Sequence, residues 1–268
     1  HLAAVPDIAH ELCQSGCTAI AYETVTAPVR GLPLLKPMSA VAGRVAIQAG
    51  ATALQKSQGG SGILISGAEG MPPAKVLIIG AGTVGTNSAE VALGLQADVT
   101  IVDRTPANLA RVKTQLGERL RTAAPDQVPD LVAGADLVIG AALVAGATAP
   151  RLVTREMLRT MRSGSVLVDV SIDQGGCFET SRPTTLAEPT YVEEGIVHYC
   201  VTNMPGDVPR TSTLALNHAT LPFVQALADK GWEQACTDDP HLADGLNVKG
   251  GEICHPAVAE ALLANRSD

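Results

Sequence analysis

The fold of this chain is decided by the ten residues Val76–Gly85, which read VLIIGAGTVG. The first four residues of this stretch, Val76–Ile79, are all apolar, which is typical of a strand buried on both faces of a parallel sheet. The glycines that follow have the spacing GxGxxG, and we expect a helix to begin inside this motif. A strand, a glycine turn and a helix in this order favour a site for the pyrophosphate of a dinucleotide.

Each part of the motif has its own role in that interpretation. Gly80 permits the tight turn, Gly82 lets the backbone approach the pyrophosphate, and Gly85 lets the helix pack closely against the strand. The free N–H groups at the start of the helix, at Thr83 and Val84, then face the phosphates. A glycine turn that binds no ligand is the alternative reading.

Asp103 completes the candidate nucleotide site. It directly follows the next apolar run, Val99–Val102. Dinucleotide sites of this kind carry an acidic residue about 20 residues after the first glycine, and Asp103 has that spacing from Gly80. Its carboxylate is placed to accept hydrogen bonds from an adenosine ribose and to repel a 2′-phosphate. We therefore predict NAD rather than NADP, although the neighbouring Arg104 weakens this preference.

The rest of the chain alternates apolar runs with helical patterns, which predicts an α/β fold with a doubly wound, Rossmann-type parallel sheet. The expected strands of the sheet are Val76–Ile79, Val99–Val102, Leu137–Ile139, Val166–Val168 and Ile196–Tyr199. The expected helices around them are Pro37–Lys56, Pro106–Leu116, Asp126–Ala133 and Thr154–Met161. Outside this region we expect helices at Pro6–Ser15, Thr211–Asn217, Thr220–Lys230 and His255–Leu263, and a short strand within Thr18–Tyr22.

Composition excludes several classes of protein. The net charge of −8 and the shortage of aromatic residues argue against binding to nucleic acid. The uncharged stretch Leu137–Pro150 is too short to cross a bilayer. The chain begins with His1-Leu2-Ala3-Ala4, without the pattern of a signal peptide, so we expect a cytoplasmic protein with reduced thiols. A metal bound by Cys13 and Cys17 is disfavoured, because no histidines follow at the required spacing.

Three segments follow predicted strands and can reach the carboxyl edge of the sheet, where doubly wound folds bind their ligands. They are Ala141–Leu143, Val170–Gly176 and Asn203–Gly206. Asp173 is the notable residue, because it lies just past an apolar strand and is followed closely by two glycines. From the residues alone, a catalytic carboxylate and a turn-capping aspartate are equally good interpretations.

At these residues the sequence resembles the alanine dehydrogenase family and its relatives, the nicotinamide nucleotide transhydrogenases. The runs DQGGC, from Asp173 to Cys177, and ETSRPTT, from Glu179 to Thr185, favour the dehydrogenases. The resemblance extends over essentially the whole chain. Further matching segments are Leu34–Ser39, Val41–Arg44, Pro72–Lys75, Ala135–Gly140, Asp169–Ser171, His198–Val201 and Asn203–Pro205.

The resemblance implies two domains with an active site between them. The nucleotide domain would comprise residues 34–208, and residues 1–33 and 209–268 would form the remainder of a discontinuous substrate domain. The implied reaction is the reversible oxidative deamination of L-alanine to pyruvate and ammonia, with NAD as hydride acceptor. The resemblance also implies a homo-oligomer, a hexamer, for which the small-residue face of helix Pro37–Lys56 is a candidate interface. Packing inside the domain is an equally good reading of that face, which consists of Ala42, Ala46, Ala49 and Ala53.

The family's functional residues fall on defined positions. Its acid/base histidine falls on His1 and its catalytic aspartate on Asp173. Imidazole titrates near neutrality, which suits a group that must give and take protons as water adds and ammonia leaves. A carboxylate would stabilise the cationic intermediate. The expected cofactor contacts are Ser39, Gly80, Gly82, Thr83, Val84, Gly85, Asp103, Asn108, Ala142, Leu143, Val170, Asp173, Asn203 and Met204.

The sequence also departs from the family. Relatives begin about a quarter of a chain earlier, so we expect a processed, trimmed or partial form that lacks the N-terminal part of the substrate domain. The basic residues that hold the substrate carboxylate would be in that part. Arg44, Arg182 and Arg210 are more readily explained as solvated or ion-paired residues than as replacements. Asp207 adds a negative charge near the expected cofactor.

The sequence is therefore compatible with three functions. The first is an NAD-dependent alanine dehydrogenase. The second is an NAD(H)-binding module without turnover, because the carboxylate-binding region is missing. The third is a transhydrogenase-like subunit that passes hydride between two nucleotides. Alanine-dependent absorbance at 340 nm distinguishes the first from the other two, and hydride transfer to a nucleotide analogue without alanine identifies the third.

Overall fold

The computed structural model describes residues 2, 5–29, 31–142 and 151–264. The chain divides into two compact units, which are described separately below. One unit is continuous and comprises Ser39–Pro209. The other is discontinuous and combines His1–Met38 with Arg210–Asp268. The assignment of residues 34–208 to a nucleotide domain remains a prediction.

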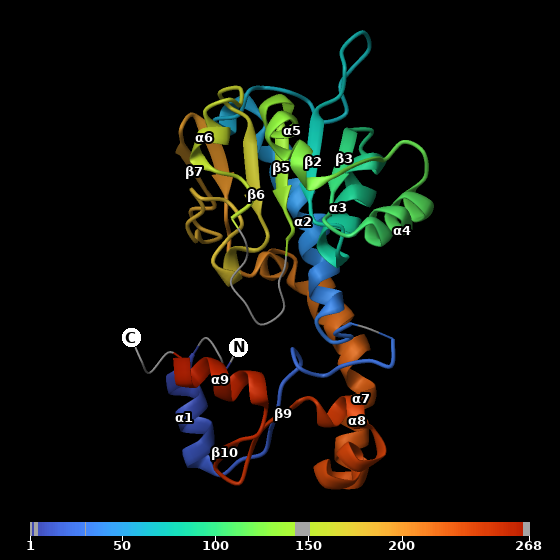
Figure 1. The fold of residues 1–268 in the computed structure, drawn as a ribbon, viewed down its shortest axis with the longest axis vertical. Coiled ribbons are helices and arrows are strands. Elements are labelled where there is room, and N and C mark those ends of the chain that lie inside the picture. Colours follow the sequence, from blue (N-terminus) through green and yellow to red (C-terminus); the bar gives the residue numbers. More distant parts are fainter. Residues whose placement is uncertain (1, 3–4, 30, 143–150, 265–268) are drawn as a thin grey trace. The chain divides into compact units, whose positions relative to one another are not determined.

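The continuous unit is built on a seven-stranded sheet with the strand order β4-β3-β2-β5-β6-β8-β7 (Figure 1). All neighbouring strands are parallel except β7 and β8, which pair antiparallel at one edge. The chain first builds outward from β2 to β4 and then returns to the other side of β2. The boundary between β2 and β5 is therefore the switch point where doubly wound sheets bind ligands. The strands are β2 (Lys75–Ile79), β3 (Asp98–Val102), β4 (Arg121–Ala123), β5 (Leu137–Gly140), β6 (Val166–Asp169), β7 (Thr190–Glu193) and β8 (Ile196–Tyr199).

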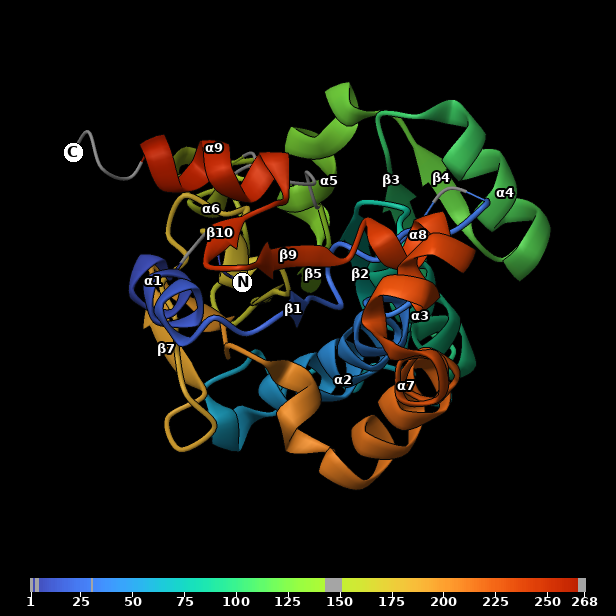
Figure 2. The ribbon, with the colours of Figure 1, turned by 90° about the horizontal axis from the view of Figure 1, so that it is seen from below.

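Helices cover both faces of this sheet (Figure 2). On one face, Leu77, Val138 and Leu167 of the central strands pack against α5 (Val128–Gly134) and α6 (Arg155–Leu158). On the other face lie α2 (Lys36–Ala53) and α3 (Thr83–Gly94), with α4 (Pro106–Leu116) beside them. The central strands are buried throughout, which explains why their sequences are continuous apolar runs.

The structure confirms the predicted fold class. The predicted strands of the sheet correspond to β2, β3, β5, β6 and β8, and the predicted helix Pro106–Leu116 is α4. The helix expected at Thr154–Met161 is shorter, because only Arg155–Leu158 is helical. The segment expected as helix Asp126–Ala133 begins as a 3-10 turn, Pro125–Gln127, before α5. The small-residue face of α2 packs inside the chain, because Ala42, Ala46 and Ala53 are buried.

The discontinuous unit contains a three-stranded antiparallel sheet, β1-β9-β10. Its apolar core consists of Val25, Leu34, Ala235 and Leu242. The two predicted helices after Pro209 are one element, α7, which is interrupted only at Gly231. The elements of this unit are α1 (Pro6–Ser15), β1 (Ala19–Ile20), α7 (Pro209–Asp238), α8 (Pro240–Ala243), β9 (Leu246–Lys249), β10 (Glu252–Ile253) and α9 (Pro256–Ala264).

Ion pairs lie at both margins of the large sheet. At the β4 margin, Arg121 pairs with Asp98 of β3. At the β7 margin, Arg155 pairs with Glu193 and, at 2.8 Å, with Glu194. These side chains are partly exposed, so water screens the pairs and they add little to stability.

Candidate active site

The predicted site residues follow strands that are neighbours in the sheet. Asp103 follows β3, Gly80 follows β2, and Ala142 follows β5. The segment with Asp173 follows β6, and Asn203 lies beyond the end of β8. Because these strands are parallel, all five positions lie along one carboxyl edge, on both sides of the switch point.

The glycine turn between β2 and α3 has the geometry that the motif predicts. Gly80 has a φ of 113°, and a Cβ there would lie 2.5 Å from the carbonyl oxygen of Ala141. At Gly85 a Cβ would lie 1.8 Å from the carbonyl oxygen of Gly80. At Gly82 it would meet nothing within 4 Å, so this side of the turn is open. The first N–H groups of α3 have no partner within their own helix, and the turn therefore fits a pyrophosphate.

Helix α2 packs closely against the start of α3. A Cβ at Gly43 would lie 2.3 Å from the carbonyl oxygen of Val84, and the Ser88 hydroxyl donates to the carbonyl of Gly43 at 2.9 Å. Ser39, a predicted cofactor contact, lies four residues before Gly43 and so shares its face of α2. Ser39 is half-buried on the side of α2 that meets the glycine turn.

Asp103 holds the glycine turn against α4. Its Oδ2 accepts the N–H of Ala81 at 2.7 Å, and its Oδ1 accepts the N–H of Thr105 at 2.7 Å and the Asn108 amide at 3.2 Å. Two carboxylate oxygens offer about four acceptor positions, so Oδ2 has capacity left for a ribose hydroxyl. Arg111, which the sequence analysis did not identify, donates to the carbonyl of Ala81 at 2.7 Å. Its position one helical turn after Asn108 was the signal that could have found it.

The ends of β5 and β6 are tied together. Val170 donates its N–H to the carbonyl of Gly140 at 2.9 Å, and the buried Ser171 hydroxyl donates to the carbonyl of Ala142 at 2.7 Å. Both Val170 and Ala142 are half-buried. The structure thus brings the two predicted segments into direct contact.

Asp173 lies in a 3-10 turn, Ile172–Gln174, and its carboxylate faces the backbone N–H of Asn203. This approach brings together the loops after β6 and β8. Partial burial raises the pKa of the Asp173 carboxyl above its usual value, and the N–H of Asn203 opposes that rise. Asn203 has a left-handed backbone, with a φ of 55°, and Met204 beside it is buried. The Asp173 side chain remains exposed to solvent, so it is available to a substrate.

Asp169, at the end of β6, is a buried carboxylate that no sequence motif marks as functional. Its carboxylate accepts N–H groups from Ser171 at 3.0 Å and from Cys177 at 2.9 Å, and the hydroxyl of Ser181 at 2.5 Å. Burial raises its pKa, and these hydrogen bonds oppose the rise. A carboxylate at the end of an apolar strand was the only available signal.

Two predicted site residues, His1 and Leu143, lie outside the described residues. The basic residues considered as substitutes have other partners or surroundings. Arg44 pairs with Glu90 at 2.6 Å, and the Arg182 guanidinium lies 3.8 Å from the centre of the Tyr191 ring. Arg210 is exposed. Asp207 is also exposed. Burial raises the pKa of Tyr199, and the negative charge of Asp207 adds to that rise.

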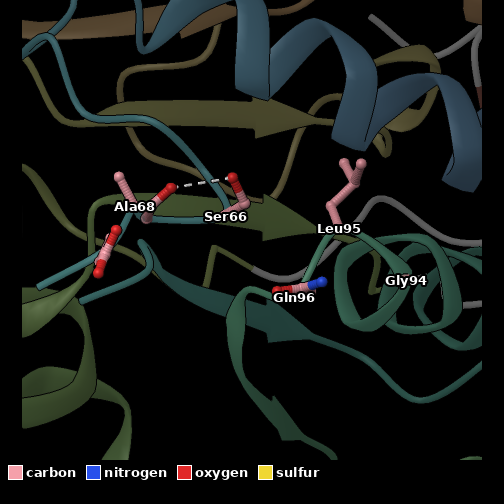
Figure 3. A pocket seen from close by; sticks show the side chains of 7 residues that line it. Ser66, Ala68, Gly94, Leu95 and Gln96 are labelled. Carbon is pink, nitrogen blue, oxygen red and sulfur yellow. Dashed lines mark hydrogen bonds between the residues drawn. The ribbon is translucent and has the colours of Figure 1, made fainter. Parts of the chain in front are cut away.

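A hollow of about 490 Å³ lies away from this edge (Figure 3). It is lined by residues 66–69, before β2, and by Gly94, Leu95 and Gln96, at the end of α3. It therefore belongs to the amino ends of β2 and β3, opposite the glycine turn.

Within the described part of the chain, no group of three or more His, Cys, Asp or Glu residues is placed to hold a metal ion. In the same part, no helix is long and apolar enough to cross a membrane.

Comparison with known proteins assigns the family. Residues 46–256 match the family described as alanine dehydrogenase/PNT, C-terminal domain. An alanine dehydrogenase of Halomonas elongata is 59% identical over 263 residues, which cover 97% of this chain and 71% of the relative. The chain belongs to the alanine dehydrogenase family. Its predicted membership is confirmed, and it is an oxidoreductase with a nucleotide-binding Rossmann fold.

Solved structures of this family and of its relatives agree with that assignment. A structure titled L-alanine dehydrogenase superposes with a TM-score of 0.93 at 48% identity, covering 98% of this chain and 73% of the other. A transhydrogenase from Sinorhizobium meliloti superposes with a TM-score of 0.76 at 25% identity, covering 95% and 71%. Both the sequence identity and the superposition thus favour the alanine dehydrogenases.

Proposed function

We propose that this chain catalyses the NAD-dependent, reversible oxidative deamination of L-alanine to pyruvate and ammonia. The observation that carries the proposal is the position of Asp173. In a member of the alanine dehydrogenase family, this carboxylate is exposed at the carboxyl edge of the sheet, two strands from the open glycine turn. A bound NAD and an acidic group would therefore lie at the same edge of the sheet.

The cofactor would be held by backbone more than by side chains. The N–H groups at the start of α3 would bind the pyrophosphate, and Asp103 would accept a ribose hydroxyl. The other predicted contacts with the cofactor are Ser39, Asn108, Ala142, Leu143, Val170, Asp173, Asn203 and Met204. When bound, NAD supplies the acceptor for the hydride that leaves the substrate Cα.

Asp173 would act on the substrate. Loss of hydride from the Cα of an amino acid leaves a cationic iminium, and the ionised carboxylate stabilises that positive charge. His1 is proposed as the acid/base group for the addition of water and the release of ammonia. The nucleotide domain would comprise residues 34–208, and residues 1–33 and 209–268 would contribute the remainder of the substrate domain.

We also propose that the protein is cytoplasmic and forms a homo-oligomer, a hexamer. The small-residue face of α2 does not support an interface there, because Ala42, Ala46 and Ala53 are already buried. Light scattering tests the assembly, and a sharp monomer peak would contradict it.

The test of the activity is the replacement Asp173→Asn, with Asp130→Asn as control. Asp130 is an exposed carboxylate near Lys75 and Asp98, at the amino ends of β2 and β3. We expect alanine-dependent absorbance at 340 nm in the parent and a loss of roughly 100-fold or more in kcat in Asp173→Asn. NADH affinity, followed by fluorescence, should fall far less than kcat, because Asp173 is only one of the predicted cofactor contacts and the glycine turn is intact.

The same assay separates the alternatives. NADH binding without alanine turnover in the parent would indicate a binding module. Reduction of a nucleotide analogue by NADH without alanine would indicate a transhydrogenase-like subunit, for which the structural likeness to the Sinorhizobium meliloti protein provides a reason.

A further inference from the structure

Asp169 is a buried charge surrounded by neutral donors. It ends β6, and its exposed fraction is 0%. Oδ1 accepts the N–H of Ser171 at 3.0 Å and faces the Cys177 thiol at 3.4 Å. Oδ2 accepts the N–H groups of Cys177 at 2.9 Å and Phe178 at 3.4 Å, and the Ser181 hydroxyl at 2.5 Å. Both oxygens act as acceptors, which is the pattern of an ionised carboxylate.

These donors enclose the segment that carries the candidate catalytic residue. The first donor is two residues before Asp173, and the others are four to eight residues after it. The backbone therefore leaves the carboxylate at Ser171, passes through Asp173 and returns at Cys177. The carboxylate therefore supplies acceptors for backbone N–H groups at both ends of the loop, where they would otherwise be buried without partners.

Two glycines allow the loop to close around the carboxylate. Gly175 and Gly176 have φ values of 91° and 77°, which disfavour other residues. A Cβ at Gly176 would lie 2.9 Å from Oδ2 of Asp169. A Cβ at Gly140, on β5, would lie 2.2 Å from the Cys177 sulfur. The close approach of backbone to carboxylate is thus built into the sequence.

A contribution to stability does not explain why this charge is buried. Burial raises the pKa of Asp169 above its value in the unfolded chain, so the folded state binds the proton more tightly. Ionisation therefore lowers the stability of the fold as the pH rises through the folded pKa. A costly charge beside a candidate active site favours a functional role.

We propose that Asp169 is a positioning residue, whose ionised carboxylate fixes residues 171–181 so that Asp173 meets Asn203 and the substrate. This inference rests on the proposed function. Asp169 itself touches neither substrate nor cofactor in this arrangement, and it acts through Asp173. Asparagine has the same shape, but its NH₂ group would take the place of one carboxylate oxygen. That group would point its N–H bonds at the donors that the lost oxygen accepts, so asparagine cannot replace the carboxylate.

The kinetic test compares Asp169→Asn with Asp136→Asn in the full chain. Asp136 is a matched control, because it is also buried and accepts a backbone N–H, from Lys75 at 2.8 Å, but it lies at the amino edge of the sheet. We expect kcat to fall about 30- to 100-fold in Asp169→Asn, since misplacement of about 1 Å can cost that much. The KM for NAD should stay within about threefold, and Asp136→Asn should retain the parent kcat. Equal losses in both variants would overturn the proposal.

A double-mutant cycle with Asp173→Asn separates positioning from general loss of structure. If Asp169 acts through Asp173, adding Asp169→Asn to Asp173→Asn should lower kcat by less than about threefold further. Multiplicative losses would show that the two residues act independently, and this result would overturn the proposal.

Hydrogen exchange provides a readout that needs no activity. The amides of Ser171, Cys177 and Phe178 should exchange slowly in the parent and at least about tenfold faster in Asp169→Asn, but not in Asp136→Asn. The milder variant Ser181→Ala keeps the carboxylate and should produce a smaller change in the same direction. Unchanged exchange in both Asp169→Asn and Ser181→Ala would overturn the role of Asp169. Absence of alanine turnover in the parent would overturn the proposed function alone.

Discussion

The glycine turn after β2 and the loop after β6 lie at the same edge of one sheet, but they are built in opposite ways. The glycine turn depends on side chains that are absent, because a Cβ at Gly80 or Gly85 would collide with backbone oxygens. The β6 loop depends on a side chain that is present, because Asp169 collects the donors of residues 171–181. The first arrangement leaves N–H groups free for a ligand, and the second uses N–H groups to hold its own shape.

The largest effect that tests this comparison is expected at Gly85. The replacement Gly85→Ala puts a Cβ 1.8 Å from the carbonyl oxygen of Gly80, so strand and helix must separate. We expect a loss of about 1–3 kcal/mol in the free energy of unfolding, measured by urea denaturation, together with loss of NADH binding. The matched variant Gly82→Ala adds a Cβ with nothing within 4 Å. It should keep the unfolding free energy and weaken NADH binding about tenfold, by about 1.4 kcal/mol. Equal stability of the two variants would show that the turn is not packed as described.

A smaller effect is expected at Asp103, which links the glycine turn to the choice of cofactor. Replacement by Asn keeps one acceptor and removes the negative charge. Two like charges about 4 Å apart interact by roughly 1 kcal/mol or more near water. We therefore expect the preference for NADH over NADPH to fall by about five- to tenfold, measured by fluorescence titration of both nucleotides. The neighbouring variant Arg104→Gln should shift the preference in the opposite direction, towards NADH. An unchanged ratio in Asp103→Asn would contradict the assignment of Asp103 to the ribose.

The smallest effect concerns His198 on β8, which forms a hydrogen bond with Thr180 in the loop after β6. Its Nδ1 lies 2.9 Å from the carbonyl oxygen of Ile196, so Nδ1 carries the proton and Nε2 accepts the Thr180 hydroxyl. Burial lowers the pKa of His198 below its ordinary value of 6.5. The unfolded chain therefore binds this proton more readily, and stability declines as the pH falls below 6.5.

The expected slope is at most about 1.4 kcal/mol per pH unit, the limit for one proton. Urea midpoints between pH 5.0 and 7.5 measure it, and His198→Gln should reduce the pH dependence. The control His10→Gln removes an exposed histidine and should leave the dependence unchanged. A dependence that persists in full in His198→Gln would rule out this origin.

The sequence was sufficient to predict the central strands, because strands buried on both faces are continuous apolar runs. It was insufficient for β4 and β7, which lie at the edges of the sheet and are partly exposed. Their residues, Arg121–Ala123 and Thr190–Glu193, carry no apolar run. The sequence pattern divides the long helix α7 at Asn217, where polar residues interrupt it, although the helix continues.

The candidate site shows the same limit. Gly80, Gly82 and Gly85 could be assigned from the sequence because backbone conformation and close approach are local requirements. Asp173 could be singled out, but its approach to the N–H of Asn203 joins two loops that only the sheet order brings together. The role of Asp169 could not be deduced, because its donors reach it only when the chain folds back over the next twelve residues.

The ion pairs at the two margins of the large sheet have a consequence for the behaviour of the protein in concentrated solution. Strands at open margins present unpaired backbone groups that can recruit a strand from another molecule. Here each edge strand carries a paired charge, Arg121 on β4 and Glu193 on β7, whose partners lie on β3 and α6. A second molecule that extended the sheet would have to dehydrate these groups, so the charged margins disfavour fibrillar self-association.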